Sequence, residues 1–352
     1  MQISNTKNIL CSVFTTLFLY LFFTNIKAFS QYTFEALNLC YTTVIPSLYI
    51  FIVFTTYLSN TEFTPNLSTP FMPFFQLLNI KNKQIASYCL LSIISGFATG
   101  GYLISKLKNE YDCSKNMITV LSVLMSNNSP AFVICAVGLN MLGNISSGII
   151  LYISMLFSSL TTAFILSVLL PYNCDFADKI SKKHNFDLTT AIHSAVSSML
   201  YICGVIITIF PVCKVFQLHM RNIVFSTMLS AISEVTTGCH MIISNCGKNI
   251  YLICIALTLC PLSTYFQLKS HCENLNIIPL LLSKIIQIPI ALLILRIAIN
   301  LFPQSFAVYA IGDISVKTYW NRPDISCCML ILSLCFVVFF DKKIGVFTNL
   351  HK

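Results

Sequence analysis

The sequence holds few side chains that could do chemistry, and the most informative is a lone carboxylate in an apolar setting. Glu234 is the only acidic residue inside the long apolar stretches of the chain. A carboxylate inside a bilayer indicates a functional site by default, because its charge is costly there. It could carry a proton or a sodium ion, or accept a hydrogen bond from a solute. The structural alternative is a Glu234 side chain bonded to the backbone of its own turn or to His240.

Two further polar clusters interrupt apolar sequence. Asn127, Asn128 and Ser129 precede Pro130. Their amide and hydroxyl groups both donate and accept hydrogen bonds, which suits a polar solute or a cation; a simple capping turn is the alternative. The segment 95–100 has small, donor-rich residues whose backbone N–H groups can meet an anion. No catalytic triad, phosphate-binding loop or zinc-protease motif accompanies these clusters, so we do not expect an enzyme.

Basic residues, cysteines and histidines carry less information. Lys284 and Arg296 interrupt the apolar stretch 276–302, where the simplest interpretation is that both side chains reach toward opposite membrane interfaces. The 16 cysteines include no C-x-x-C pair, and many lie inside apolar runs as small apolar side chains. The six histidines are scattered. We therefore expect no metal site.

The composition defines the elements that must position these residues. Of 352 residues, 56% are hydrophobic and 9% are charged, whereas soluble domains have about 25% charged residues. The mean hydropathy of +0.79 predicts a polytopic membrane protein surrounded by lipid. The net charge of +9 comes from basic residues in short connectors, so it reports membrane topology and not a nucleic-acid partner.

An internal repeat relates two of the polar interruptions. Residues 91–100 and 229–238 share six of ten positions at an offset of 138, and both change from apolar helix to small polar residues. A second interruption follows in each half, at 126–130 and at 260–264. Inside a bilayer, interrupted backbone is tolerated only where protein or a water-filled cavity satisfies it. Four interruptions in two matching pairs therefore predict one shared cavity, as in carriers built from repeats.

Charge distribution selects between two topologies. If 84–105 and 222–247 are re-entrant hairpins, thirteen of the 21 basic residues lie on one side, six on the other and two within a span. This division obeys the positive-inside rule. The expected fold is all-α, with about eight transmembrane helices and two re-entrant helical hairpins in two inverted repeats. Both termini are expected to be cytoplasmic.

The expected organisation has five parts. The N-terminal apolar stretch is interpreted as an uncleaved span and not as a secretory signal. The parts are an N-terminal transmembrane helix and connector (1–35), a first repeat (36–171), a polar cytoplasmic connector (172–187), a second repeat (188–302), and a loop with a C-terminal transmembrane helix (303–352).

Four short segments resemble motifs of a known family. They are SGFATG at 95–100, NNSPAF at 127–132, SEVTTG at 233–238, and Leu262-Ser263 followed by Gln267. They are similar to motifs of the YlbJ-type sporulation integral membrane proteins, of the nucleoside-recognition or gate domain group, whose layout is similar to concentrative nucleoside transporters. The resemblance covers about residues 36–302. It implies a multi-pass protein of the mother-cell-derived outer forespore membrane that passes dipicolinic acid, a small aromatic dicarboxylate.

The repeat and the resemblance together place the expected solute-binding or ion-binding residues at the four interruptions. These are Ser95, Gly96, Thr99, Gly100, Asn127, Asn128, Ser129, Glu234, Thr236, Thr237, Gly238, Ser263 and Gln267. The chain departs from the family pattern at Ala98, Gly101-Tyr102, Thr237 and Cys260-Pro261.

The leading hypothesis for the function is a membrane carrier for a small polar or anionic solute. It needs no cofactor other than a coupling proton or sodium ion. The alternative is a non-transporting membrane scaffold for spore-envelope or cortex assembly, with the 172–187 connector as its docking site.

Overall fold

The computed structural model describes residues 12, 15–16, 18–61, 63–111, 113–170, 172, 188–220, 222–271 and 277–302. Throughout these residues the chain is helical and forms no strand, which confirms the expected all-α class. The expected C-terminal transmembrane helix, the 172–187 connector apart from its first residue, and most of the N-terminal half of the first expected span lie outside the described residues.

The first half of the chain forms a series of helices of very different lengths. They are α2 (Ile26–Leu39), η1 (Cys40–Val44), α3 (Ile45–Leu58), α4 (Thr64–Leu67), η2 (Thr69–Phe71), α5 (Met72–Leu77), α6 (Lys83–Ser95), α7 (Phe97–Glu110), α8 (Lys115–Met125), η3 (Ala131–Met141) and α9 (Ile145–Leu169). The elements η1 and η3 are π-helical. The second half comprises α10 (Leu188–His219), α11 (Ile223–Ser233), α12 (Val235–Cys246), α13 (Ile250–Thr258), α14 (Leu262–His271) and α15 (Ile277–Leu301).

Side-chain caps start many of these helices where the sequence places an Asn or Ser. The side chain of Asn82 accepts from Gln84 N at 2.8 Å and starts α6. Asn222 does the same for α11, through Val224 N at 3.1 Å. An oxygen at this position satisfies backbone N–H groups that have no partner within the helix. The first helices of the two repeated segments therefore begin in the same way.

Five helices among the described residues are long and apolar enough to cross a membrane. They span Ile26–Leu58, Ile145–Leu169, Leu188–His219, Ile250–Lys269 and Ile278–Leu301. Of the eight spans expected from the sequence, the one beginning at residue 116 is divided into two shorter helices, α8 and η3. The first and last expected spans lie partly or wholly outside the described residues, so the number of crossings remains a prediction.

One expected boundary is wrong. Residues 27–35 were expected to form a connector, but α2 begins at Ile26 and joins η1 and α3 in one apolar helix of 33 residues. The isolated charges Lys27 and Glu35 do not end a helix that contains no glycine in this stretch. Pro46 lacks an N–H group, and the π-helical turn η1 lies directly before it, where the hydrogen-bond pattern is already changed.

Two pairs of helices form hairpins at the repeated segments. In hairpin 1 (α6 and α7), Tyr88 Oη donates to Glu110 Oε2 at 2.8 Å, across the two arms. In hairpin 2 (α11 and α12), Asn245 Nδ2 donates to Thr227 Oγ1 at 2.8 Å. These bonds join residues far apart along the chain, so the arms run back alongside each other, in agreement with the hairpin expectation.

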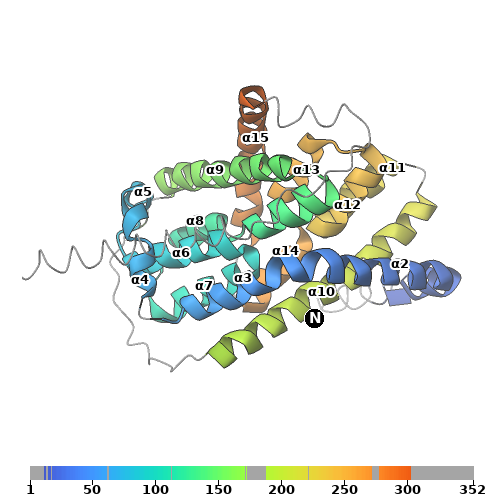
Figure 1. Ribbon diagram of the computed structural model, residues 1–352, viewed down its shortest axis with the longest axis horizontal. Coiled ribbons are helices and arrows are strands. Elements are labelled where there is room, and N and C mark those ends of the chain that lie inside the picture. The colour runs from blue at the N-terminus through green and yellow to red at the C-terminus, as the bar shows by residue number, and fades with distance from the viewer. Residues whose placement is uncertain are drawn as a thin grey trace, which may run out of the picture.

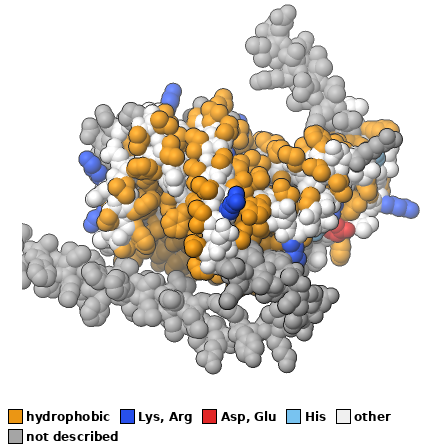
Figure 2. All heavy atoms as spheres, turned by 90° about the horizontal axis from the view of Figure 1, so that it is seen from above, with side chains coloured by type: hydrophobic (Ala, Val, Ile, Leu, Met, Phe, Trp, Pro, Cys, Tyr) orange, Lys and Arg blue, Asp and Glu red, His pale blue; other side chains and the backbone are white. Residues whose placement is uncertain are grey.

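The helices bury two apolar clusters and leave much apolar surface exposed. One cluster joins η1, α3, η3, α9, α10 and α13, and the other joins α5 to α8. In Figure 1, α9 lies along one side of α6 and α8, and α15 runs across α9. Hydrophobic side chains dominate the face seen in Figure 2, where few charged groups appear. Long apolar helices with large exposed apolar side chains make this chain an integral, multi-pass membrane protein.

Candidate functional site

The tip of hairpin 1 lies directly on the interruption between α8 and η3, residues 126–130, named break 1 here. Phe97 N donates to the carbonyl oxygen of Asn127 at 2.7 Å, and Ser92 Oγ donates to that of Met125 at 3.1 Å. A Cβ on Gly100 would lie 1.9 Å from the Met125 carbonyl oxygen. Gly96, at the tip, has a φ of +77°, which L side chains rarely adopt. Glycine at these two positions therefore permits the contact.

Break 1 is a buried, polar piece of non-helical backbone. Asn127 Nδ2 donates to the carbonyl oxygens of Val123 at 3.3 Å and Leu124 at 3.0 Å, so it caps the end of α8. Ser129 Oγ accepts from Phe132 N at 3.1 Å and caps the start of η3. For these two residues the capping alternative describes the geometry.

Asn128 has a different role, because it reaches the second half of the chain. Its Nδ2 donates to the carbonyl oxygen of Leu257 at 2.6 Å, in the last turn of α13. Its Oδ1 is buried and accepts no hydrogen bond from the residues that the structure describes. Cys260 and Pro261 follow α13 and form the second interruption, break 2. Asn128 thus connects the neighbourhoods of the two breaks and keeps a free acceptor there.

Lys284 of α15 completes this junction, and the sequence analysis missed it. Its Nζ donates to Gln287 Oε1 at 2.8 Å and to Ser126 Oγ at 3.4 Å, and its side chain is 3% exposed. Gln287 Nε2 donates in turn to Asn127 Oδ1 at 3.2 Å. Lys284 also interacts electrostatically with Cys260 of break 2. We call the group Ser126, Asn127, Asn128, Lys284 and Gln287 the break junction.

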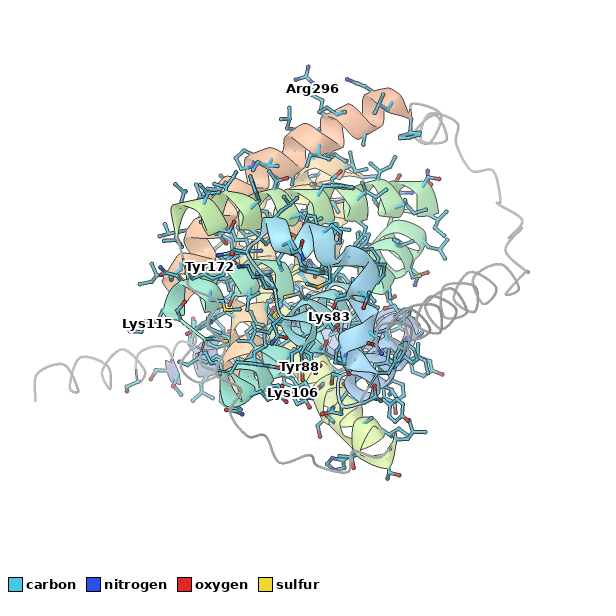
Figure 3. The ribbon with its side chains drawn as sticks, turned by 90° about the vertical axis from the view of Figure 1, so that its left-hand side faces the viewer. Lys83, Tyr88, Lys106, Lys115, Tyr172 and Arg296 are labelled. Atoms are coloured by element: carbon cyan, nitrogen blue, oxygen red, sulfur yellow. The ribbon has the colours of Figure 1, made fainter. Side chains whose placement is uncertain are left out.

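The expectation that Lys284 reaches a membrane interface is therefore wrong. Arg296, on the same helix, is exposed and lies at the outer edge of the molecule in Figure 3. The signal that separates them is spacing: Lys284 and Gln287 are three residues apart in an otherwise apolar helix, and positions three apart share a face.

Glu234 is engaged within its own hairpin. Its Oε1 accepts from Thr236 N at 2.8 Å, and its Oε2 accepts from Thr237 N at 2.5 Å and Thr237 Oγ1 at 2.7 Å. This is the helix-capping alternative, with the carboxylate at the positive end of α12. His240 takes no part, since its ring lies against Phe210 at 5.4 Å between centroids.

The other expected site residues are buried but bond locally. The hydroxyls of Ser95 and Thr99 hydrogen-bond to each other in hairpin 1. Gly238 allows close packing inside hairpin 2, since a Cβ there would lie 2.5 Å from Ala231 Cα. Ser263 and Gln267 are buried on α14, which packs against α7. The structure thus gathers hairpin 1 and break 1 at the junction, while the polar groups of Glu234, Thr236 and Thr237 bond inside hairpin 2.

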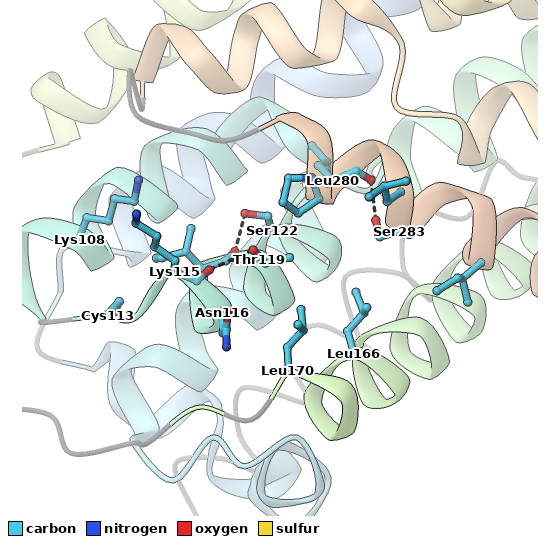
Figure 4. Close-up of a pocket in the computed structure, with 14 residues that line it drawn as sticks. Lys108, Cys113, Lys115, Asn116, Thr119, Ser122, Leu166, Leu170, Leu280 and Ser283 are labelled. Atoms are coloured by element: carbon cyan, nitrogen blue, oxygen red, sulfur yellow. Dashed lines mark hydrogen bonds between the residues drawn. The ribbon is translucent and has the colours of Figure 1, made fainter.

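A pocket of about 760 Å³ lies between α8, α9 and α15, next to the break junction. Lys108 and Lys115 lie together at one end of it, with Ser283 at the other (Figure 4). None of its lining residues is acidic. Ser122 also lines it and precedes Ser126 of the junction by four residues, about one helical turn.

No family model, curated protein or solved structure matches this chain. Chemically, the break junction offers a cationic donor at Lys284 and a free acceptor at Asn128 Oδ1. Such a pair can bind a small solute that carries both an anionic or accepting group and a donor.

Proposed function

We propose that this protein is a membrane carrier for a small polar or anionic solute, which binds at the break junction. The observation that carries the proposal is the buried meeting of break 1, the end of α13 and Lys284 inside an apolar helical protein. Burying polar groups costs free energy unless they are matched. A protein that only needs to stay in a bilayer gains nothing from such a junction, whereas a carrier needs polar groups along its path.

The arrangement of elements supports transport by alternating access. Interrupted helices that meet hairpin tips form binding sites in many secondary transporters. Hairpins 1 and 2 start at equivalent Asn caps and turn at the same repeat position, Gly96 and Glu234. We include in the proposal that the two halves are inverted relative to each other, with eight crossings and cytoplasmic termini. A coupling proton or sodium ion belongs to the same proposal.

Contacts at the ends of the helices fit this topology. Asn79 Nδ2 donates to the carbonyl oxygen of Tyr172 at 3.3 Å, and both residues are assigned to the cytoplasmic side. Lys248 Nζ lies 3.6 Å from the Cβ position of Gly143, and both belong to the opposite side. The resemblance at the four motifs adds dipicolinic acid as the first solute to test and the outer forespore membrane as the location.

Uptake into liposomes tests the proposal. Purified protein is reconstituted, and the uptake of labelled dipicolinate, succinate and uridine is compared with that of empty liposomes. Asn128→Leu removes the bond to Leu257 and the free acceptor, while Thr161→Val removes an exposed hydroxyl that bonds only within α9. We expect uptake of at least one solute by the wild type and by Thr161→Val, and a loss of most of it in Asn128→Leu that still elutes as a folded protein.

Equal uptake by Asn128→Leu and the wild type would place the path elsewhere. Absence of uptake of all three solutes would favour the scaffold. A separate measurement addresses the solute implied by the resemblance: normal dipicolinate content in spores of a deletion strain would remove it.

A further inference from the structure

Lys284 is a buried basic residue without an acidic partner in the described part of the chain. The ion pair found there joins Lys106 and Glu110, not Lys284. The groups around Lys284 Nζ are the neutral side chains of Gln287 and Ser126, and the bond to Ser126 is long at 3.4 Å. An ammonium group has three donors, so one remains without a hydrogen bond to these residues.

The energetics of a buried charge ask for a partner of opposite sign. Removing an ammonium group from water costs several kcal/mol even after relaxation, and neutral hydrogen-bond acceptors compensate only part of this. The electrostatic partner on break 2 is the Cys260 thiol, which is a weak acceptor. A bound anionic group would supply both the missing charge and the missing acceptor. The structural alternative is an uncharged Lys284 amine that only ties α15 to break 1.

The adjoining pocket provides an approach with the matching sign of charge. Lys108 and Lys115 line it and no acidic residue does, so its potential attracts anions. The hydroxyls of Ser122 and Ser283 also line it and are buried. Ser283 directly precedes Lys284 in the chain, so the pocket adjoins the backbone that carries the ammonium group.

We propose that Lys284 selects the charge of the solute by pairing its ammonium group with a carboxylate of a small organic anion at the break junction. The Ser126 hydroxyl, already within reach of Lys284 Nζ, donates a second hydrogen bond to the carboxylate. Asn128 Oδ1 accepts from a donor elsewhere on the solute. This inference rests on the proposed carrier function and adds to it a residue outside all four sequence motifs.

Heat unfolding of the purified full-length protein measures binding without transport. Exposure of the buried cysteines, such as Cys89 and Cys254, is followed with a thiol-reactive dye. The added compounds are benzoate, its neutral isostere benzamide, succinate and inorganic phosphate. The variants are Lys284→Met, which keeps length without charge, Lys284→Arg, which keeps the charge, and Arg296→Met as the matched control on α15.

We expect benzoate or succinate, and not benzamide, to raise the midpoint of the wild type and of Arg296→Met. Loss of a hydrogen bond to a charged group should weaken the response of Lys284→Met about 10- to 100-fold in concentration. Lys284→Arg should keep part of the response. If Lys284→Met cannot be purified, Lys284→Gln takes its place.

Three results would overturn the proposal: an unchanged carboxylate response in Lys284→Met, a wild type that responds to phosphate but to neither carboxylate, or a wild type that responds to no anion. Uptake of uridine together with no anion response would remove the role of Lys284 and leave the carrier standing. Carboxylate binding that needs Lys284, without uptake of any solute, would remove the carrier and leave the site.

Discussion

A methyl group added at Gly100 tests whether hairpin 1 is seated on break 1. The Cβ of an alanine there would lie 1.9 Å from the Met125 carbonyl oxygen, whereas ordinary contacts begin at 3.4 Å. The helix or the break must move by about 1.5 Å, the difference between these distances. Met125 O also accepts the hydrogen bond from Ser92 Oγ, so the same movement weakens that bond.

The expected cost follows from these contacts. Overfilling a packed site typically costs about 1–3 kcal/mol. Loss of the Ser92 bond adds about 1 kcal/mol. The better helix propensity of alanine returns about 1 kcal/mol. The net destabilisation of Gly100→Ala should therefore be about 1–3 kcal/mol. Gly204→Ala is the matched control, because no atom lies within 4 Å of its Cβ position and α10 should gain stability.

Thermal unfolding in detergent and solute uptake provide the assay. Smaller domains lose about 2–4 °C in midpoint per kcal/mol, so Gly100→Ala should unfold several degrees below Gly204→Ala. Its uptake should also fall, because break 1 is displaced. Equal midpoints and equal uptake in the two variants would refute the seating of hairpin 1 on break 1.

Two further predictions concern hairpin 2 and the topology. Glu234→Gln keeps an acceptor for the N–H groups of α12, so it should cost about 1 kcal/mol or less and leave uptake intact, whereas Glu234→Ala should cost about 1–2 kcal/mol; loss of uptake in stable Glu234→Gln protein would instead assign the carboxylate to ion coupling. In sealed vesicles, an impermeant thiol reagent should label Gln76→Cys and Asn109→Cys from the cytoplasmic face, and Asn140→Cys and Lys248→Cys from the other. Labelling of positions 109 and 248 from one face would exclude the hairpin topology.

Local sequence determines the breaks and the hairpins, and both could be predicted. A proline after Asn-Asn-Ser cannot continue the hydrogen bonds of α8, and Gly96 has a backbone conformation that other residues avoid. The charge division then selected hairpins over spans. The N-terminal boundary was missed because Lys27 and Glu35 suggested a connector, although single charges at the edge of an apolar run leave the helical hydrogen bonds intact.

The roles of individual polar residues depended on tertiary contacts. Glu234 is seen to cap α12 only when the positions of Thr236 and Thr237 are known. Lys284 becomes informative because α15 runs across α9 and brings this residue to Ser126, which lies 158 positions away in the sequence. No local pattern encodes that crossing, although the spacing of Lys284 and Gln287 indicates that one face of α15 is polar.

The most direct test of the carrier asks whether the break junction is reached from both sides of the membrane. Cys260 lies in break 2 beside Lys284 and is 7% exposed, whereas Cys254, on α13, is 1% exposed. An impermeant anionic thiol reagent is applied to right-side-out and to inside-out vesicles, and labelled peptides are identified by mass spectrometry. The account predicts slow labelling of Cys260 from each face and none of Cys254. Protection of Cys260 from both faces, in protein that labels normally at an exposed engineered cysteine, would contradict it.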